Sequence, residues 1–136
     1  MGILIDASVL IEHERGRLQI AKHVAGREAD ELFLSVITAS ELLHGVHRAT
    51  DLGTRARRAA FVEAILDRFP VLTVDLATAR AHARLRADLA SVGSLIGPHD
   101  LWLAAACLTH GLSIATVNTR EFLRVPGLVV REWKGA

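Results

Sequence analysis

Short apolar runs alternate with longer amphipathic segments along this chain. The short runs predict buried strands at residues 3–5, 32–35, 71–74, 112–116 and 128–130. Between them, apolar residues recur every three or four positions, which predicts helices over residues 9–15, 18–25, 39–46, 55–69, 76–92 and 98–110. Strands that alternate with helices in this way predict an α/β domain with a mostly parallel central sheet.

Cap and turn residues set the expected boundaries of these elements. Asp6 is expected to start a capped turn after the first strand. Thr38 and Glu41 have the spacing of a capping box, which predicts that Glu41 lies in the first turn of its helix. Pro98 predicts the start of a later helix and Gly111 its end. The charge-rich residues 48–58 are expected to form an exposed connection between helices.

Composition narrows the class of protein. The chain has 136 residues, of which 51% are hydrophobic, so we expect a single domain over residues 1–136 with a sizeable core. The one cysteine, Cys107, excludes a disulfide scaffold and lies in an apolar run where burial is expected. The sequence shows neither a signal peptide nor an apolar stretch long enough for a membrane span. We therefore expect a cytoplasmic protein without membrane contact.

Charge and motif content exclude several function classes. The net charge is +1, which neither requires nor forbids a nucleic-acid partner. Fourteen of the sixteen basic residues are arginine, which suits phosphate recognition, although a GC-rich genome gives the same bias. The chain lacks a Gly-x-Gly-x-x-Gly or Walker loop and a Gly-x-Ser-x-Gly motif, which argues against nucleotide cofactors and serine hydrolases.

Polar residues with carboxylate or amide groups lie where the predicted strands end or helices begin: Asp6, Glu41, Asp100 and Asn118. Ligand sites of parallel sheets lie at the carboxyl ends of the strands, so these side chains are expected to gather there. Each has an alternative explanation as a cap, a helix-dipole partner or a turn residue. Clustered carboxylates repel one another unless a cation joins them, and oxygen ligands favour Mg²⁺ or Mn²⁺.

Four segments in order then carry a resemblance to a known family. They are Ile3-Leu4-Ile5-Asp6-Ala7-Ser8-Val9-Leu10-Ile11, Ser40-Glu41-Leu42 with Gly45, Pro98-His99-Asp100-Leu101-Trp102-Leu103-Ala104-Ala105, and Thr116-Val117-Asn118-Thr119-Arg120-Glu121-Phe122 with Val125-Pro126-Gly127-Leu128. Together they resemble the PIN-domain ribonucleases, and among them the VapC-type toxins of toxin–antitoxin pairs. The resemblance runs from residue 3 to about residue 133.

This resemblance implies a three-layer α/β/α fold and an endoribonuclease with an acidic pocket for Mg²⁺ or Mn²⁺. Asp6, Glu41 and Asp100 match the pocket acids. Asp6 and Asp100 are then expected to hold the cation, while Glu41 orients or deprotonates the attacking water. The expected reaction is hydrolysis of an RNA phosphodiester bond.

The fourth catalytic position differs from the residue most common in the family, while the hydroxyl positions beside the pocket match. Asn118 stands where an aspartate is common, and Glu121 either supplies the missing carboxylate or lies on the surface. Ser8 and Thr116 match hydroxyl positions beside the pocket and are expected to bind substrate or to cap. His99 adjoins Asp100 and is a further candidate for substrate contact.

The resemblance also implies partners: a small antitoxin protein whose C-terminal segment covers the acidic pocket, and a second copy in a homodimer. The helices over residues 55–69 and 76–92 offer candidate dimer surfaces. The competing hypothesis is a PIN-like domain that binds RNA or protein without cleaving it, and the amide at Asn118 keeps it open. A phosphatase of the haloacid-dehalogenase type is excluded because Ser8 replaces its second aspartate.

Overall fold

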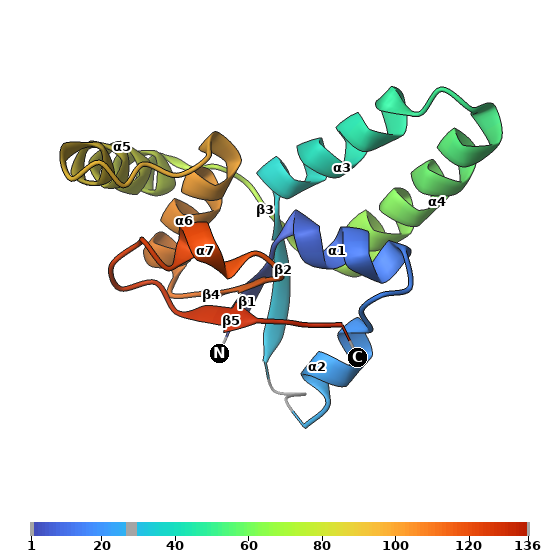
Figure 1. Ribbon diagram of the computed structural model, residues 1–136, viewed down its shortest axis with the longest axis horizontal. Helices are drawn as coiled ribbons and strands as arrows, with labels where there is room; N and C mark the ends of the chain where they lie inside the picture. The colour runs from blue at the N-terminus through green and yellow to red at the C-terminus, as the bar shows by residue number, and fades with distance from the viewer. Residues whose placement is uncertain (1, 27–29, 136) are drawn as a thin grey trace.

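A parallel β-sheet runs through the middle of the molecule (Figure 1). The structure is a computed structural model that describes residues 2–26 and 30–135. Within those residues the strands are β1 (Gly2–Ile5), β2 (Glu31–Ser35), β3 (Val71–Leu72), β4 (Ser113–Thr116) and β5 (Val130–Glu132). Their spatial order is β3-β2-β1-β4-β5, and every pair is parallel. The predicted parallel sheet is confirmed.

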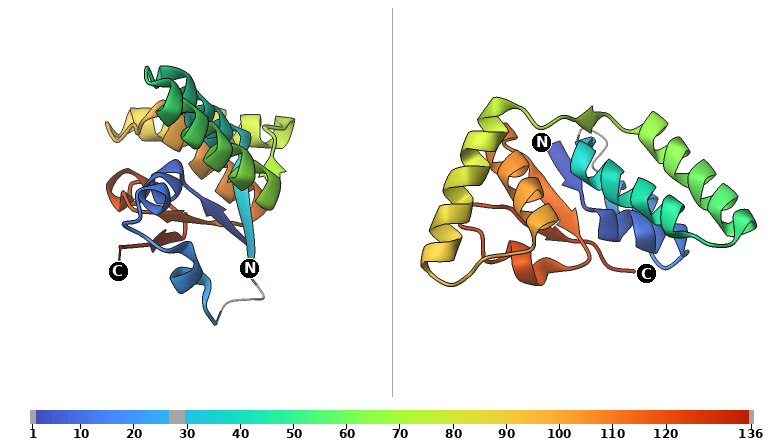
Figure 2. Two further views of the ribbon diagram at one scale, coloured as in Figure 1. Left: turned by 90° about the vertical axis from the view of Figure 1, so that its right-hand side faces the viewer. Right: turned by 90° about the horizontal axis from the view of Figure 1, so that it is seen from above.

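Helices cover both faces of this sheet. They are α1 (Ala7–Glu14), α2 (Ile20–Val24), α3 (Val36–Arg48), α4 (Leu52–Arg68), α5 (Leu76–Ser91), α6 (Pro98–His110) and α7 (Thr119–Phe122). Side chains alternate between the two faces of a strand, so Ile3 and Ile5 pack in one core with α1 to α4. Leu4 points the other way, into a core with α5, α6 and α7. Figure 2 shows the two groups of helices on either side of the strands, which confirms the predicted α/β/α layers.

The helix α6 is buried on several sides, as its apolar sequence predicts. Six of its residues are buried: Leu101, Leu103, Ala104, Ala105, Ala106 and Cys107. The Cys107 side chain is packed among apolar neighbours, and this burial raises the pKa of its thiol to about 12. Cys107 is therefore part of the core. In the described part of the chain, every helix is too short or too polar to cross a membrane.

The central strand β1 determines where a site can form. The chain adds β2 and β3 on one side of β1, and then crosses over to add β4 and β5 on its other side. Open parallel sheets bind ligands at such a point, beyond the carboxyl ends of the strands. Asp6 follows β1 there, and its backbone N–H donates to the carbonyl of Ala115 in β4 at 2.9 Å. The chain is thus held in register up to the point where polar side chains begin.

The predicted start of α3 is wrong, and this moves Glu41. The helix begins at Val36 because Ser35, the last residue of β2, also caps it by accepting from the backbone N–H of Ile37 at 3.1 Å. The capping box at Thr38 does not exist, since Thr38 lies inside the first turn and is fully buried. Glu41 consequently lies in the second turn of α3.

Other boundaries also differ from the sequence predictions. Helix α4 begins at Leu52, because Asp51 accepts from the backbone N–H of Thr54 at 2.8 Å, so most of residues 48–58 are helical rather than a connection. Strand β3 has two residues and β5 begins two residues later than expected. The short helix α7 was not predicted. Val92, expected on the apolar side of α5, is 71% exposed.

Candidate functional site

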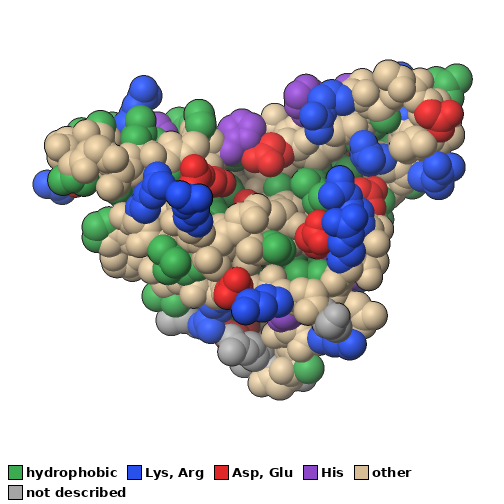
Figure 3. Space-filling view, in the orientation of Figure 1, with side chains coloured by type: hydrophobic (Ala, Val, Ile, Leu, Met, Phe, Trp, Pro, Cys, Tyr) green, Lys and Arg blue, Asp and Glu red, His purple; other side chains and the backbone are tan. Residues whose placement is uncertain are grey.

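Acidic side chains from three layers of the fold come together at the carboxyl edge of the sheet. Asp6 follows β1, Glu41 comes from α3, Asp100 from the first turn of α6 and Glu121 from α7. The space-filling view shows acidic groups near the middle of this face, with arginine and lysine on both sides (Figure 3). The N-termini of α1, α3 and α7 follow strands at this same edge, and their positive dipole ends favour anions there.

Asp6 is the buried acid of the site. It occupies the N-cap position of α1, yet its side chain makes no capping hydrogen bond. Its Oδ2 instead accepts hydrogen bonds from the Ser8 hydroxyl at 2.6 Å and from the Thr116 hydroxyl at 2.9 Å. The side chain is only 6% exposed. Burying a carboxylate is unfavourable without such partners, so the two hydroxyls explain how Asp6 is accommodated.

Ser8 and Thr116 are also tied to the loop that follows β4. The Thr116 hydroxyl accepts from the backbone N–H of Asn118 at 3.0 Å, and the Ser8 hydroxyl accepts from that of Val117 at 3.2 Å. Thr116 is fully buried, which favours a role in holding Asp6 over the predicted contact with substrate. The two hydroxyls join α1 to the end of β4 and fix the direction of the Asp6 carboxylate.

Asp100 and Glu121 form an acidic pair in which two carboxyl groups face each other. Burial is the main cause that raises the pKa of Asp100 to about 8; a hydrogen bond to Glu121 and repulsion from Asp6, Glu121 and Glu41 add to it. The pKa of Glu121 is lowered, chiefly by the same hydrogen bond to Asp100. A protonated Asp100 therefore donates to an ionised Glu121, which also accepts weakly from the backbone N–H of Gly97 at 3.4 Å.

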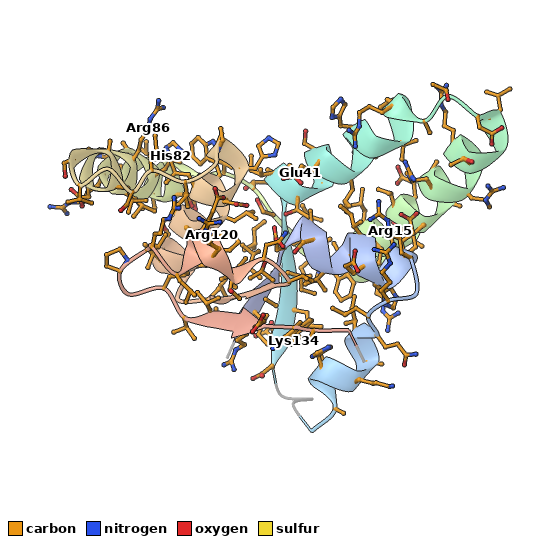
Figure 4. All side chains as sticks on the ribbon, in the orientation of Figure 1. Arg15, Glu41, His82, Arg86, Arg120 and Lys134 are labelled. Atoms are coloured by element: carbon orange, nitrogen blue, oxygen red, sulfur yellow. The ribbon has the colours of Figure 1, made fainter. Side chains whose placement is uncertain are left out.

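Glu41 meets the site from the other flank and is held by a histidine. Its Oε1 lies 2.7 Å from Nδ1 of His99, and this contact links α3 to α6. Both side chains remain accessible, with His99 56% and Glu41 33% exposed. Figure 4 shows Glu41 between Arg120 on the α7 side and Arg15 on the α1 side. The predicted contact of His99 with substrate stays a prediction, while its contact with Glu41 was not foreseen.

The structure separates the two candidates for the fourth polar position. Asn118 is exposed at the N-cap position of α7, where its side chain makes no capping hydrogen bond. Glu121, one helical turn later, reaches Asp100 instead. The three-residue spacing between Asn118 and Glu121 is the only sequence signal for this contact. That signal is useful only if residues 119–122 are helical, and a segment this short gives no helical pattern. Of the two open interpretations of Glu121, the geometry favours a place in the site.

The chemistry of these side chains fits a hard divalent cation. No group of three or more His, Cys, Asp or Glu side chains in residues 2–26 and 30–135 is already arranged to hold one. Burial, followed by the hydrogen bond to Glu121 and repulsion from nearby acids, nevertheless raises the pKa of Asp100. A cation would favour the ionised form of Asp100, because it offsets both the cost of a buried charge and the repulsion between carboxylates. Carboxylate oxygens without thiolates are the ligands that Mg²⁺, Ca²⁺ and Mn²⁺ prefer.

Comparison with known proteins agrees with this geometry. Residues 3–128 match the PIN domain family. The chain is 35% identical over 130 residues to "Ribonuclease VapC1" of Rickettsia felis, covering 96% of this chain and 95% of the relative. It is 36% identical over 133 residues to "tRNA(fMet)-specific endonuclease VapC" of Shigella flexneri, covering 98% of both chains.

A solved structure extends the similarity to the whole fold. The crystal structure of DNA-bound VapBC from Salmonella typhimurium superposes with a TM-score of 0.87 and 28% sequence identity. The match covers 98% of this chain and 98% of that one. The arrangement of sheet and helices is therefore shared with a chain of that VapBC structure.

Proposed function

The chain belongs to the PIN-domain family, and from this membership we propose that it is a VapC-type endoribonuclease, the toxin of a type II toxin–antitoxin pair. The relatives that it matches over nearly the full length of both chains are named as a ribonuclease and an endonuclease. One observation carries the proposal: Asp6 and Glu41, far from Asp100 in sequence, lie close enough to it at the carboxyl edge of the sheet to help raise its pKa. The reaction is hydrolysis of an RNA phosphodiester bond.

Asp6 and Asp100 are the residues that would hold the divalent cation, Mg²⁺ or Mn²⁺. When bound, such an ion lowers the pKa of water and neutralises charge that develops on the phosphate. Asp6 is ready for this role because the Ser8 and Thr116 hydroxyls already fix its carboxylate. Asp100 becomes ready on losing its proton, and Glu121 supplies a further negative charge beside it.

Glu41 orients the attacking water and accepts its proton. Its Oε1 is fixed by His99, which leaves the rest of an accessible carboxylate for water. Asn118 lies exposed at the start of α7, where its amide is available to substrate. Positioning and electrostatics dominate phosphoryl-transfer catalysis, so the chain needs no side-chain nucleophile.

The proposed partners are an antitoxin and a second copy of the chain. The solved relative from Salmonella typhimurium is a VapBC assembly, which supports a small antitoxin protein that covers the acidic edge. Large apolar side chains at the two ends of α5 are exposed: Leu76 at 66% at its start and Val92 at 71% just after its end. Such exposed apolar side chains support a homodimer, which light scattering on the purified chain would detect as twice the mass of 14.7 kDa.

The test is cleavage of labelled RNA by the purified chain while Mn²⁺ is titrated. We expect cleavage that depends on the metal, stops with chelator, and falls at least about a thousandfold in Asp100→Asn, because one ligand and its charge are lost. Asp67→Asn, which removes an exposed carboxylate from α4, is the matched control and should cleave like the parent.

The outcomes separate the two hypotheses for this fold. If Asp100→Asn cleaves as fast as the parent, the acidic edge is not the catalytic centre. If the parent binds RNA with measurable affinity but yields no metal-dependent product, the chain is a binding domain, and the nuclease assignment is wrong.

A further inference from the structure

A second hollow lies beside the acidic edge and shares Glu41 with it. This cavity of about 90 Å³ lies between α1, α3 and α4. Its floor is apolar and consists of Ile11, Leu42, Phe61 and Val62. Three arginines, which we call its rim, also line the cavity: Arg15, Arg48 and Arg58. Two acids, Glu14 and Glu41, line it as well. The cavity is therefore a small slot of apolar and charged side chains in which arginines outnumber acids, and it shares Glu41 with the acidic edge.

Gly45 lines this cavity, and nothing within the described chain requires a glycine there. Its backbone is helical and has no positive φ. A Cβ built on it would meet no heavy atom within 4 Å beyond its own helix backbone. Glycine inside a helix is unfavourable by about 1 kcal/mol relative to alanine. The open space above Gly45 leaves room for a group from outside this chain to approach the backbone of α3.

The basic rim has capacity for an anion. No hydrogen bond or ion pair joins the Arg48 side chain to another residue in the described part of the chain. Arg15 has only a long contact of 3.8 Å to Glu12 and is 55% exposed. Arg58 is more committed, since it donates to the carbonyl of Gly45 at 3.3 Å and lies 3.9 Å from Glu14. At least two guanidinium groups are therefore available to phosphate.

Spacing along α3 connects this rim to the acidic edge. Glu41, Gly45 and Arg48 stand at positions i, i+4 and i+7, which share one face of a helix. At 1.5 Å per residue, Glu41 and Arg48 are separated by roughly 10 Å along the axis. A nucleic-acid strand with one phosphate at Glu41 and the next group over Gly45 would present its following phosphate to Arg48.

We propose that the Gly45 cavity is a nucleotide subsite: it takes the base next to the scissile phosphate of a single-stranded RNA, and Arg48 and Arg15 hold the adjoining phosphates. This inference rests on the proposed ribonuclease function. A base is flat and apolar on its faces and so fits a slot floored by Leu42 and Phe61, while its phosphate suits arginine. The apolar floor contributes affinity and the rim contributes dependence on salt.

The experiment measures binding rather than cleavage. Fluorescence anisotropy of a short labelled single-stranded RNA is recorded in the Asp100→Asn background over a range of salt concentrations. Gly45→Leu fills the slot and should weaken binding about tenfold, the value of one stacked base, while leaving the salt slope unchanged. Arg48→Gln should reduce the slope of log affinity against log salt by about 0.7, as expected for one lost phosphate contact on a single strand.

Matched variants separate these effects from loss of fold. His47→Leu places the same side chain elsewhere on exposed α3, and Arg57→Gln removes an arginine from exposed α4, so both should bind like the background. Gly45→Ala should raise Tm, since alanine favours the helix. Weaker binding by a Gly45 variant of raised or equal Tm therefore reports the slot itself.

Three results would overturn the inference. Unchanged RNA affinity in Gly45→Leu would show that no base enters the cavity. Unchanged RNA affinity with impaired assembly with the antitoxin would assign the cavity to a protein segment instead. Absence of any RNA binding in the background protein would overturn the proposed function together with the subsite. By contrast, an inactive Asp100→Asn with an unaffected Gly45→Leu overturns the subsite alone.

Discussion

Two aspartates of the same site are accommodated in opposite ways. Asp6, at the end of the central strand, is almost completely buried and accepts two short hydrogen bonds from hydroxyl groups. Asp100, at the start of α6, is half-buried, and burial first, then its hydrogen bond to Glu121 and repulsion from nearby acids, raises the pKa of its carboxyl to about 8. The two carboxyl groups therefore differ in their partners: hydroxyl donors face Asp6, whereas another carboxyl group faces Asp100.

The site therefore has two regions. Around Asp6 the hydrogen bonds are already formed, whereas around Asp100 a bound cation is still needed to offset the negative charges. In the region around β1 and β4, the carboxyl group of Asp6 accepts hydrogen bonds from two neutral hydroxyl groups. The region around α6 and α7 places Asp100 against Glu121 with a proton between them. Substitutions that change one region at a time test this difference.

Thr116→Val removes one of the two hydroxyl groups that donate to Asp6. The buried Asp6 and the backbone N–H of Asn118 both lose a partner, so we expect the free energy of unfolding to fall by about 2 kcal/mol, or Tm by roughly 5–10 °C. Calorimetry measures this. Thr38→Val is the control, because Thr38 is equally buried but its hydroxyl has no partner among the described residues, so its loss should be neutral or stabilising.

Equal losses of Tm in these two valine variants would contradict the comparison. They would mean that the hydroxyl of Thr116 contributes no more than packing, and that Asp6 does not depend on it.

The raised pKa of Asp100 predicts that stability depends on pH. In the metal-free chain the folded pKa of Asp100, about 8, is above its ordinary value of 3.8, so the folded state retains a proton that the unfolded state releases. Stability from this group is complete below about pH 4 and is lost as the pH rises towards 8. Asp100→Asn should remove this dependence and stabilise the metal-free chain at pH 8 by about 1 kcal/mol, a value reduced by solvent screening.

Urea unfolding at pH 5 and pH 8 with chelator present measures this effect, and Asp67→Asn again provides the control. If Asp100→Asn is less stable than the parent at pH 8, the carboxyl is stabilised in its site and the contrast with Asp6 is wrong.

The smallest effect is expected from Glu121→Gln. It removes one of the negative charges facing Asp100 while the amide can still form a hydrogen bond, so the pKa of Asp100 should fall. Stability should change by no more than about 0.5 kcal/mol, since Glu121 lies near the surface of the site. Carbon NMR of the Asp100 carboxyl against pH measures the shift. Glu63→Gln, on exposed α4, should leave the midpoint where it is.

The layers of the fold were predictable because the apolar pattern is strong. Ile3, Leu4 and Ile5 predicted the central strand, and the apolar run of α6 predicted its burial. Boundaries failed where one residue has two roles. Ser35 ends β2 and caps α3, so the capping box that sequence placed at Thr38 was displaced by a cap three residues earlier. The helix α7 was missed because a segment of four residues is too short to show a helical repeat of apolar positions.

The site was predictable as a set of residues but not as a set of contacts. Asp6, Glu41 and Asp100 were selected because they follow strands or begin helices at one edge. The pairing of Glu41 with His99 joins α3 to α6, and that of Asp100 with Glu121 joins α6 to α7. Such pairings depend on how helices pack across the sheet, which local patterns do not encode.

The order of strands in the sheet has a consequence during synthesis. The strand made first, β1, lies in the middle and needs β4, more than a hundred residues later, on one side. Thr116 and Glu121 emerge from the ribosome later still than α6. A growing polypeptide thus carries the aspartate at position 6 long before any of its distant neighbours exist. The acidic centre is complete only after α7 has been made, so a growing polypeptide that ends before Glu121 lacks part of it.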